Sequence, residues 1–226
     1  MFIPLKDLNP RRTYPIINTT LIAANVLVFL YQYTLPQHAF KAFIITYATV
    51  PARFPAALSG HAPLEVAFLP LLTSMFLHSG ILHIAGNMLF LWIFGDNVED
   101  FYGHFTYLFF YLFCGVGSGL LHVVFNMNST VPALGASGAI SGVMGAYAIL
   151  YPRSRILTLV FIFLVPIPAV LILGFWFILQ FLSAFASLGT VTSGGVAWWA
   201  HVGGFLMGML ITVMARGRQS ARWQSA

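Results

Sequence analysis

Long apolar runs dominate the chain, and short polar or proline-rich segments separate them. A helix rises about 1.5 Å per residue, so about 20 apolar residues cross the roughly 30 Å hydrocarbon core of a membrane. Six runs approach or reach this length, at Pro15–Tyr33, Leu71–Phe94, Phe105–Phe125, Ser137–Tyr151, Pro168–Phe185 and Val196–Met214. The pattern therefore predicts an all-α membrane protein with six transmembrane helices, of which the fourth is short and partly submerged.

Two other segments are apolar but do not have the pattern of a span. The connection 34–70 contains five prolines and apolar patches such as AFIITYA, which is typical of a segment resting at the membrane interface. The run Ile156–Val165 is too short to span, and Pro166 and Pro168 follow it. We expect both segments to lie outside the six spans, and the acidic sequence GDNVED, 95–100, to end the second span.

Composition supports a membrane protein and excludes a soluble one. Hydrophobic residues make up 59% of the chain and charged residues 7%, whereas about 25% of a soluble domain is charged. The net charge of +5 does not indicate nucleic-acid binding, because the basic residues stand just outside the apolar runs. Cys114 is the single cysteine, so no internal disulfide is possible.

The positions of the basic residues predict the orientation of the six spans. With an even number of spans, most lysines and arginines fall on one side, which the positive-inside rule makes cytoplasmic. These are Lys6, Arg11, Arg12, Arg153, Arg155, Arg216, Arg218 and Arg222. We therefore expect a cytoplasmic segment 1–14, a membrane domain 15–215 and a basic cytoplasmic tail 216–226, in the cell membrane of a prokaryote.

Four polar residues from three spans are predicted to lie at nearly one depth. Ser137 stands about as far above Arg153 as His201 stands above Arg216. His83 and Asn87 lie one helical turn apart in the second span, at a similar height. Polar groups inside a bilayer are costly, so such a convergence indicates a functional site.

The chemistry open to this site is that of a serine hydrolase. A histidine within reach of a serine forms a nucleophile and general base, here His201 and Ser137. No carboxylate occurs from Phe101 to Pro152 or from Ile156 to Ala215. The pair is therefore expected to act as a dyad, and the side chains of His83 and Asn87 are candidate donors to an oxyanion.

Glycines surround the predicted nucleophile and its base. Gly135 and Gly138 flank Ser137, which would let a substrate carbonyl approach the backbone at the start of a helix. Gly204 and Gly208 lie on the same face as His201 in the sixth span. Small residues at this spacing permit close helix contact, so we expect them to bring the two catalytic side chains together.

Three short motifs resemble those of the rhomboid intramembrane serine proteases, and the likeness covers nearly all of the chain. They are GASG at 135–138, AHVGGFLMG at 200–208 and HIAGN at 83–87. The resemblance implies that Ser137 is the nucleophile, that His201 is the base, and that His83, Asn87 and the Ser137 backbone N–H stabilise the oxyanion. It also implies cleavage of single-span membrane proteins near the outer ends of their transmembrane segments, without a metal or cofactor.

The sequence departs from the family pattern in two places. Many rhomboids carry an aromatic residue four positions after the nucleophile, stacked on the histidine, where this chain has Ser141. The first long loop also lacks the Trp-Arg pair of some members. Trp176 and Gln180 in the fifth span are candidates to border a lateral opening for substrate, although ordinary packing is the favoured interpretation.

Three alternatives to a protease remain at this point. A catalytically inactive rhomboid-like protein would bind and escort transmembrane segments, but such relatives typically lack the serine or histidine that stand here. A transporter would predict an internal repeat, and none is visible between the halves of the chain. A lipid acyl hydrolase would use the same Ser–His chemistry, and the sequence does not separate it from a protease.

Overall fold

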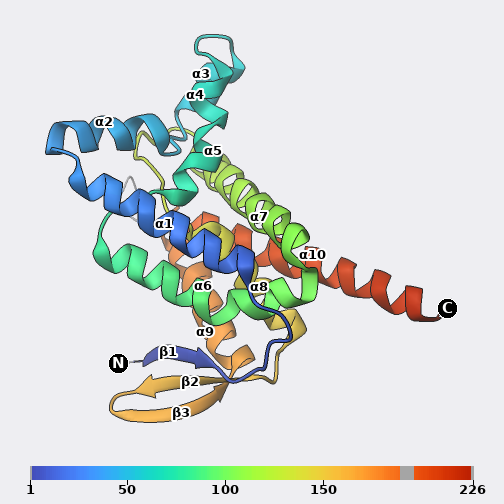
Figure 1. Cartoon of the computed structure of the whole chain (residues 1–226). Helices are drawn as coiled ribbons and strands as arrows, with labels where there is room; N and C mark the ends of the chain where they lie inside the picture. The colour runs from blue at the N-terminus through green and yellow to red at the C-terminus, as the bar shows by residue number, and fades with distance from the viewer. Residues whose placement is uncertain (1, 189–195, 225–226) are drawn as a thin grey trace.

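A helical bundle forms the body of the protein in the computed structural model, which describes residues 2–188 and 196–224 (Figure 1). Within these residues, five helices are long and apolar enough to cross a membrane. They are α1 (Ile16–Thr34), α6 (Ile81–Tyr102), α7 (His104–Phe125), α9 (Ala169–Ala186) and α10 (Trp198–Gln224). A sixth apolar helix, α8 (Ser137–Leu150), has 14 residues and is shorter than a span. The prediction of a helical membrane bundle with a short fourth core helix is confirmed.

Helix α8 lies at the centre of the bundle, and residues 138–147 on it are all buried. It packs against α6, α7 and α10. The contact with α10 is made of backbone, because a Cβ at Gly204 would stand 2.0 Å from the carbonyl oxygen of Gly138. A Cβ at Gly208 would stand 1.9 Å from the carbonyl oxygen of Gly142. The small residues thus let the two helices touch through their main chains, as the sequence predicts.

The predicted bounds of the second span are wrong at both ends. The helix begins at Ile81 rather than Leu71, and it continues through the acidic cluster to Tyr102. The acidic cluster stays helical because the carboxylate of its buried member, Glu99, accepts hydrogen bonds from the backbone of α1. Glu99 is fully buried and accepts the backbone N–H groups of Ile17 and Asn18 at 3.0 and 2.7 Å. A carboxylate at the free N–H groups that open α1 is stabilised by hydrogen bonds and by the helix dipole.

The connection between α1 and α6 forms a layer of short helices at one end of the bundle (Figure 1). These are α2 (Gln37–Tyr47), α3 (Arg53–Leu58), α4 (Leu64–Phe68), α5 (Pro70–Thr73) and the 3₁₀ helix η1 (Ser74–Phe76). Thr49 anchors the layer, because its backbone exchanges two hydrogen bonds with Ala133, at 3.0 and 2.8 Å. The Thr49 hydroxyl also donates to the carbonyl of Pro70 at 3.0 Å. A backbone pair thus holds this segment, which contains no tryptophan.

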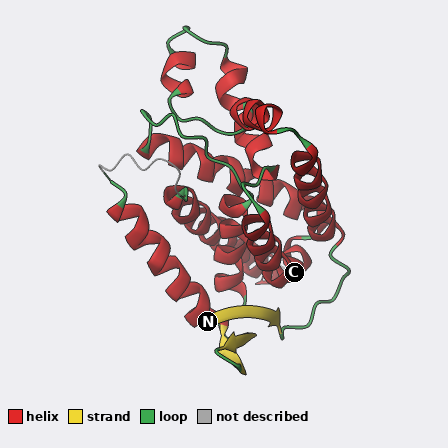
Figure 2. Cartoon of the chain, turned by 90° about the vertical axis from the view of Figure 1, so that its left-hand side faces the viewer, coloured by secondary structure: helices red, strands yellow, loops and turns green. Residues whose placement is uncertain are grey.

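A three-stranded antiparallel sheet covers the opposite end of the bundle, and the sequence pattern did not predict it (Figures 1 and 2). Its order is β1 (Phe2–Asp7), β2 (Arg155–Val160) and β3 (Phe163–Pro168). The apolar run after α8 is too short to span, and it folds into the hairpin β2–β3. Strand β1 lies within the predicted segment 1–14, and it pairs in antiparallel fashion with the edge of β2 that β3 leaves open. The pairing supplies partners for backbone groups that would otherwise be unpaired close to the membrane.

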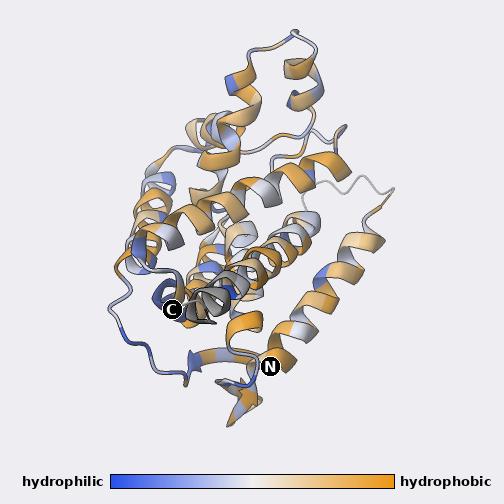
Figure 3. Ribbon diagram, turned by 90° about the vertical axis from the view of Figure 1, so that its right-hand side faces the viewer, coloured by the Kyte–Doolittle hydropathy of each residue, from blue (hydrophilic) through white to orange (hydrophobic). Residues whose placement is uncertain are grey.

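The end of α10 lies beside the end of α8. A guanidinium N–H of Arg216 donates to the carbonyl of Ile149 at 2.8 Å. Since β2 follows α8 and pairs with β1, Lys6, Arg155 and Arg216 share one end of the bundle, as the charge pattern predicts. Helix α10 continues to Gln224, through most of the predicted tail 216–226, whose cytoplasmic position stays a prediction. Figure 3 shows hydrophobic residues along the long helices and hydrophilic ones gathered between β1 and α1.

Candidate active site

Ser137 is the first residue of α8, as the sequence predicts. The preceding turn depends on Gly135, whose φ of +126° favours glycine. The backbone N–H of Gly135 donates to the carbonyl of Ser74 at 2.9 Å, which ties the turn to the layer of short helices. The first N–H groups of a helix have no partner within the helix, so Ser137 stands at a cluster of free donors.

His201 lies within hydrogen-bond distance of Ser137. Its Nε2 atom is 2.7 Å from the Ser137 Oγ, although 64 residues separate the two in the chain. The side chain of His201 is buried, with 8% of its surface exposed. The close contact of α8 and α10 near Gly204 produces this approach.

Three side chains that sequence reasoning did not assign to catalysis surround the ring of His201. The Oε1 atom of Gln180 on α9 is 2.7 Å from His201 Nδ1. The ring centroids of Trp176 and Trp198 lie 5.9 and 6.1 Å from that of His201. Trp176 and Gln180 are four residues apart, so they share one face of α9, and this spacing was the available signal.

Ser141 occupies the position where many rhomboids have an aromatic residue, and it does not support the histidine. Its hydroxyl donates to the carbonyl of Ser137 at 2.6 Å, one turn back along the helix. The side chain is fully buried. A Cβ at Gly204 would stand 3.2 Å from the Ser141 Cβ, so a larger side chain at 141 would meet α10. Trp176 and Trp198 line the histidine ring instead.

His83 and Asn87 lie near Ser137, on one face of α6. A Cβ at Gly135 would stand 2.8 Å from His83 Nε2, so the imidazole lies against the turn that precedes the serine. His83 Nδ1 is 3.0 Å from the hydroxyl of Ser79. The amide nitrogen of Asn87 is buried and has no partner within the described part of the chain. A buried donor without a partner is costly, and an oxygen arriving at this site would satisfy it.

A cavity of about 780 Å³ brings the four predicted residues together. Its polar lining includes Ser137, His201, His83 and Asn87. Its apolar lining includes Phe90 on α6 and Trp176 on α9, so the cavity lies between these two helices. The volume is that of a site for a small molecule or for several residues of a peptide.

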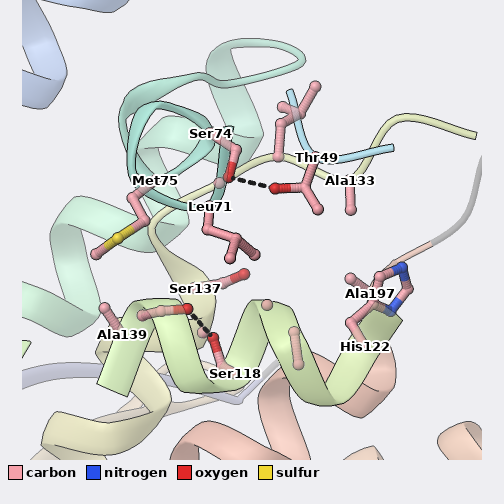
Figure 4. Close-up of a pocket in the computed structure, with 16 residues that line it drawn as sticks. Thr49, Leu71, Ser74, Met75, Ser118, His122, Ala133, Ser137, Ala139 and Ala197 are labelled. Carbon is pink, nitrogen blue, oxygen red and sulfur yellow. Dashed lines mark hydrogen bonds between the residues drawn. The ribbon is translucent and has the colours of Figure 1, made fainter. Parts of the chain in front are cut away.

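A second, small cavity of about 40 Å³ lies on another side of Ser137 (Figure 4). Hydroxyl groups of Thr49, Ser74 and Ser118 border it, together with the ring of His122. Thr49 and Ser74 hydrogen-bond to each other at 3.1 Å. This volume is enough for a few water molecules, and its polar lining gives them partners.

His104 and His78, two of the remaining histidines, have hydrogen bonds away from Ser137. His104 Nδ1 lies 2.5 Å from the buried carboxylate of Glu99. The backbone N–H of His78 donates to Gln32 Oε1 at 3.0 Å. Residues 2–188 and 196–224 contain no group of three or more His, Cys, Asp or Glu side chains placed to hold a metal. The independence from metals and cofactors stays a prediction.

The fold and this site define a helical integral membrane protein with a serine and a histidine paired inside the bundle. The Rhomboid domain family matches residues 66–218, about two thirds of the chain. The chain belongs to the rhomboid family.

Several curated proteins are similar to this chain. Rhomboid protein 1, mitochondrial, of Saccharomyces cerevisiae is 31% identical over 142 residues, which are 61% of this chain and 39% of that protein. RHOMBOID-like protein 6, mitochondrial, of Arabidopsis thaliana is 32% identical over 154 residues, 68% of this chain and 46% of that protein. Rhomboid protease GluP of Bacillus subtilis is 46% identical over 76 residues, 34% of this chain and 14% of that protein. The chain thus spans less than half the length of these relatives.

Proposed function

We propose that this chain is an intramembrane serine endopeptidase that cleaves transmembrane segments of single-span membrane proteins. One observation carries the proposal: Ser137 Oγ lies 2.7 Å from His201 Nε2 at the wall of a large, mostly apolar cavity. A hydroxyl and an imidazole at this distance can act as nucleophile and general base. A relative named as a rhomboid protease supports the same activity.

The reaction proceeds through an acyl-enzyme. As the Ser137 oxygen bonds to the carbonyl carbon of the scissile peptide, its proton passes to His201 Nε2. The same proton then goes to the leaving amine as the peptide C–N bond breaks. Water, delivered with His201 again as base, hydrolyses the ester and restores the serine. Water molecules in the small polar cavity beside Ser137 would be within reach for this step.

The negative charge that develops on the carbonyl oxygen needs donors already in place. The backbone N–H of Ser137 stands at the free start of α8 and supplies one. The Asn87 amide nitrogen, buried and without a protein partner in the described chain, supplies another. His83, whose ring lies against Gly135, completes the set. Donors that need no rearrangement at the moment of reaction contribute the largest part of such catalysis.

The surroundings of the cavity favour a transmembrane substrate. Phe90 and Trp176 place an apolar rim on α6 and α9, between which a lipid-embedded segment would approach sideways. The peptide bonds of a helix are shielded by the helix itself, so the segment must unwind locally to reach Ser137. Substrates with glycine or small residues near the outer end should therefore be cut best.

The test uses the full chain in detergent and in lipid nanodiscs. The wild type, Ser137→Ala and His201→Ala are compared for labelling by a fluorophosphonate and for cleavage of a single-span test substrate. Ser141→Ala is the matched control, because this second serine lies one turn away on the same helix. We expect both reactions to fall by at least about a thousandfold in Ser137→Ala and His201→Ala.

Each alternative has its own outcome in this test. Cleavage that persists in Ser137→Ala contradicts the proposal. A folded wild type that neither labels nor cleaves would favour the inactive binding protein. Labelling with hydrolysis of lipid esters, but no peptide cleavage, would favour the acyl hydrolase.

The proposed orientation places the β1–β2–β3 sheet in the cytoplasm and Ser137 toward the outer side. Support comes from the shared end of the bundle occupied by Lys6, Arg155 and Arg216. A prokaryotic cell membrane is the proposed location, and the Bacillus subtilis relative is consistent with it. The yeast and Arabidopsis relatives are named as mitochondrial, so localisation of a tagged full-length chain decides between the two membranes.

A further inference from the structure

The geometry points to Gln180 as the positioning residue for His201, so that the reactive group is a Ser–His–Gln relay rather than an unsupported dyad. This inference rests on the proposed function and adds to it. Gln180 Oε1 lies 2.7 Å from His201 Nδ1, and Ser137 Oγ lies 2.7 Å from the other ring nitrogen. The two contacts engage both ends of the imidazole.

The contact determines which ring nitrogen carries the hydrogen. An amide oxygen only accepts hydrogen bonds, so Nδ1 of His201 must donate to Gln180. A neutral imidazole has one N–H, and Nε2 is then free to accept the proton of Ser137. Without Gln180, the tautomer with its hydrogen on Nε2, which is unable to act as a base, would compete with this one.

Burial makes this contact more valuable than the same contact in water. Gln180 and His201 are each only 8% exposed, so neither side chain has ready access to solvent as a substitute partner. An unpaired Nδ1–H in such a site would carry a desolvation cost. Trp176, one turn before Gln180 on α9, and Trp198, one turn before His201 on α10, restrict the tilt of the ring.

A neutral amide also fits this location better than the carboxylate of a familiar triad. No Asp or Glu occurs from Ile156 to Ala215, which contains both α9 and α10. An ionised carboxylate inside the bilayer is costly when its histidine partner is neutral. The amide orients the imidazole without placing a charge there. Gln180 takes no proton at any step, and the proton of Ser137 moves only to Nε2 and then to the leaving amine.

The test combines reactivity with a direct measurement of the tautomer. Gln180→Leu removes the acceptor, Gln180→Glu retains an acceptor oxygen, and Leu182→Ala changes an exposed neighbour on α9 as a control. Fluorophosphonate labelling rates, kcat and KM for a single-span test substrate, and the imidazole ¹⁵N shifts of His201 are measured in nanodiscs. Thermal melting in detergent confirms that each variant is folded.

We expect Gln180→Leu to lower the labelling rate and kcat by about tenfold to a hundredfold, with KM changed less than threefold. The ¹⁵N spectrum should show the Nδ1–H form in the wild type and a mixture of both tautomers in Gln180→Leu. Gln180→Glu should recover most of the labelling rate, and Leu182→Ala should match the wild type.

Two results would overturn the assignment. One is a labelling rate in Gln180→Leu within twofold of the wild type. The other is a loss of kcat while His201 keeps the Nδ1–H form, which would make Gln180 a packing residue only. A wild type that labels no faster than Ser137→Ala would instead overturn the proposed function, and the relay with it.

A separate observation concerns the β2–β3 hairpin, whose tip is apolar and exposed. Phe161 and Ile162 form the turn and are 73% and 82% exposed. Phe161 has a φ of +53°, a conformation that asparagine or glycine adopts more easily. A bulky apolar residue in a strained, exposed turn indicates a surface that contacts something other than water.

We infer that the hairpin tip inserts into the membrane interface on the side of the bundle that carries the sheet. Strand β3 ends at Pro168, and α9 begins at the next residue, so the hairpin lies where a transmembrane helix enters the bilayer. The run 156–168 contains no charged residue. Lys6, Arg153 and Arg155 lie on or beside the same sheet, where they suit anionic headgroups.

The test places an environment-sensitive fluorophore on Ile162→Cys in nanodiscs of phosphatidylcholine with and without phosphatidylglycerol. Leu8→Cys, exposed just after β1, is the control, and the native Cys114 is fully buried. We expect blue-shifted emission at 162, with strong quenching by acyl-chain spin labels and weak quenching by iodide. Quenching by iodide equal to that at position 8 would overturn the inference. Shielding that appears only as protein concentration rises would also overturn it, in favour of a second copy of the chain.

Discussion

Substituting alanine for Gly208 tests whether backbone contact between α8 and α10 positions the proposed catalytic pair, Ser137 and His201. The new Cβ would stand 1.9 Å from the carbonyl oxygen of Gly142 and 2.6 Å from its carbonyl carbon. Ordinary contact begins at about 3.4 Å, so the helices must separate locally by roughly 1.5 Å. The obstacle is backbone, and no side-chain rotation relieves it. Overpacking of this kind typically costs about 1–3 kcal/mol of stability.

The separation should cost activity as well as stability. His201 lies two turns before Gly208 on α10, and Ser137 opens the helix on the other side of the same contact. A displacement of about 1 Å at a reacting pair lowers the rate by about a hundredfold. We therefore expect kcat/KM of Gly208→Ala to fall by about a hundredfold while the protein still folds.

The assay compares cleavage rates and thermal melting of Gly208→Ala with those of Gly217→Ala. Gly217 lies on the same helix, and a Cβ there would have no atom within 4 Å. It should therefore leave the cleavage rate unchanged and leave the melting temperature unchanged or slightly raised, because alanine favours a helix more than glycine does. The reasoning would be refuted if Gly208→Ala retained more than a third of wild-type activity, or if Gly217→Ala lost as much.

Three further outcomes follow from single contacts. Asn87→Ala should lower kcat by about tenfold to a thousandfold, as for the loss of one oxyanion donor, in the cleavage assay. Ser141→Ala should keep cleavage within about twofold of the wild type, because its hydroxyl only bonds back to its own helix. Burial raises the pKa of Asp7 to about 6 from the ordinary 3.8, so the folded state holds this proton more tightly than the unfolded state. Asp96 and Arg11 are charged groups near Asp7. The attachment of β1 should then weaken as pH rises from about 4 through 6, which hydrogen exchange of the β1 amides would measure. This pH dependence should disappear in Asp7→Asn.

The sequence predicts the helices and the four convergent polar residues because both depend on local rules. Apolar length marks a span, and polar groups are rare enough inside a bilayer that Ser137, His201, His83 and Asn87 are conspicuous. The bounds of α6 were harder to predict, since apolar residues continue upstream into α5 and η1, while the acidic cluster downstream is typical of the end of a span. Glu99 remains in the helix because its carboxylate accepts hydrogen bonds from backbone N–H groups at the start of α1. That partner is about 80 residues away, beyond any window of hydropathy.

The contact of Gln180 with His201 and the three-stranded sheet were both missed by the sequence analysis, and the physical reason is the same. Strand β1 is defined by its pairing with β2, about 150 residues later, and its own six residues contain no strong strand signal. The function proposed for Gln180 depends on how α9 is rotated against α10, which the pattern of neither helix specifies. His201 is conspicuous by its chemistry, but its partner is an amide, which is as common in helix packing as in catalysis. The residues proposed to react can therefore be found from the sequence, whereas the residue proposed to orient them is found only when the helices are placed side by side.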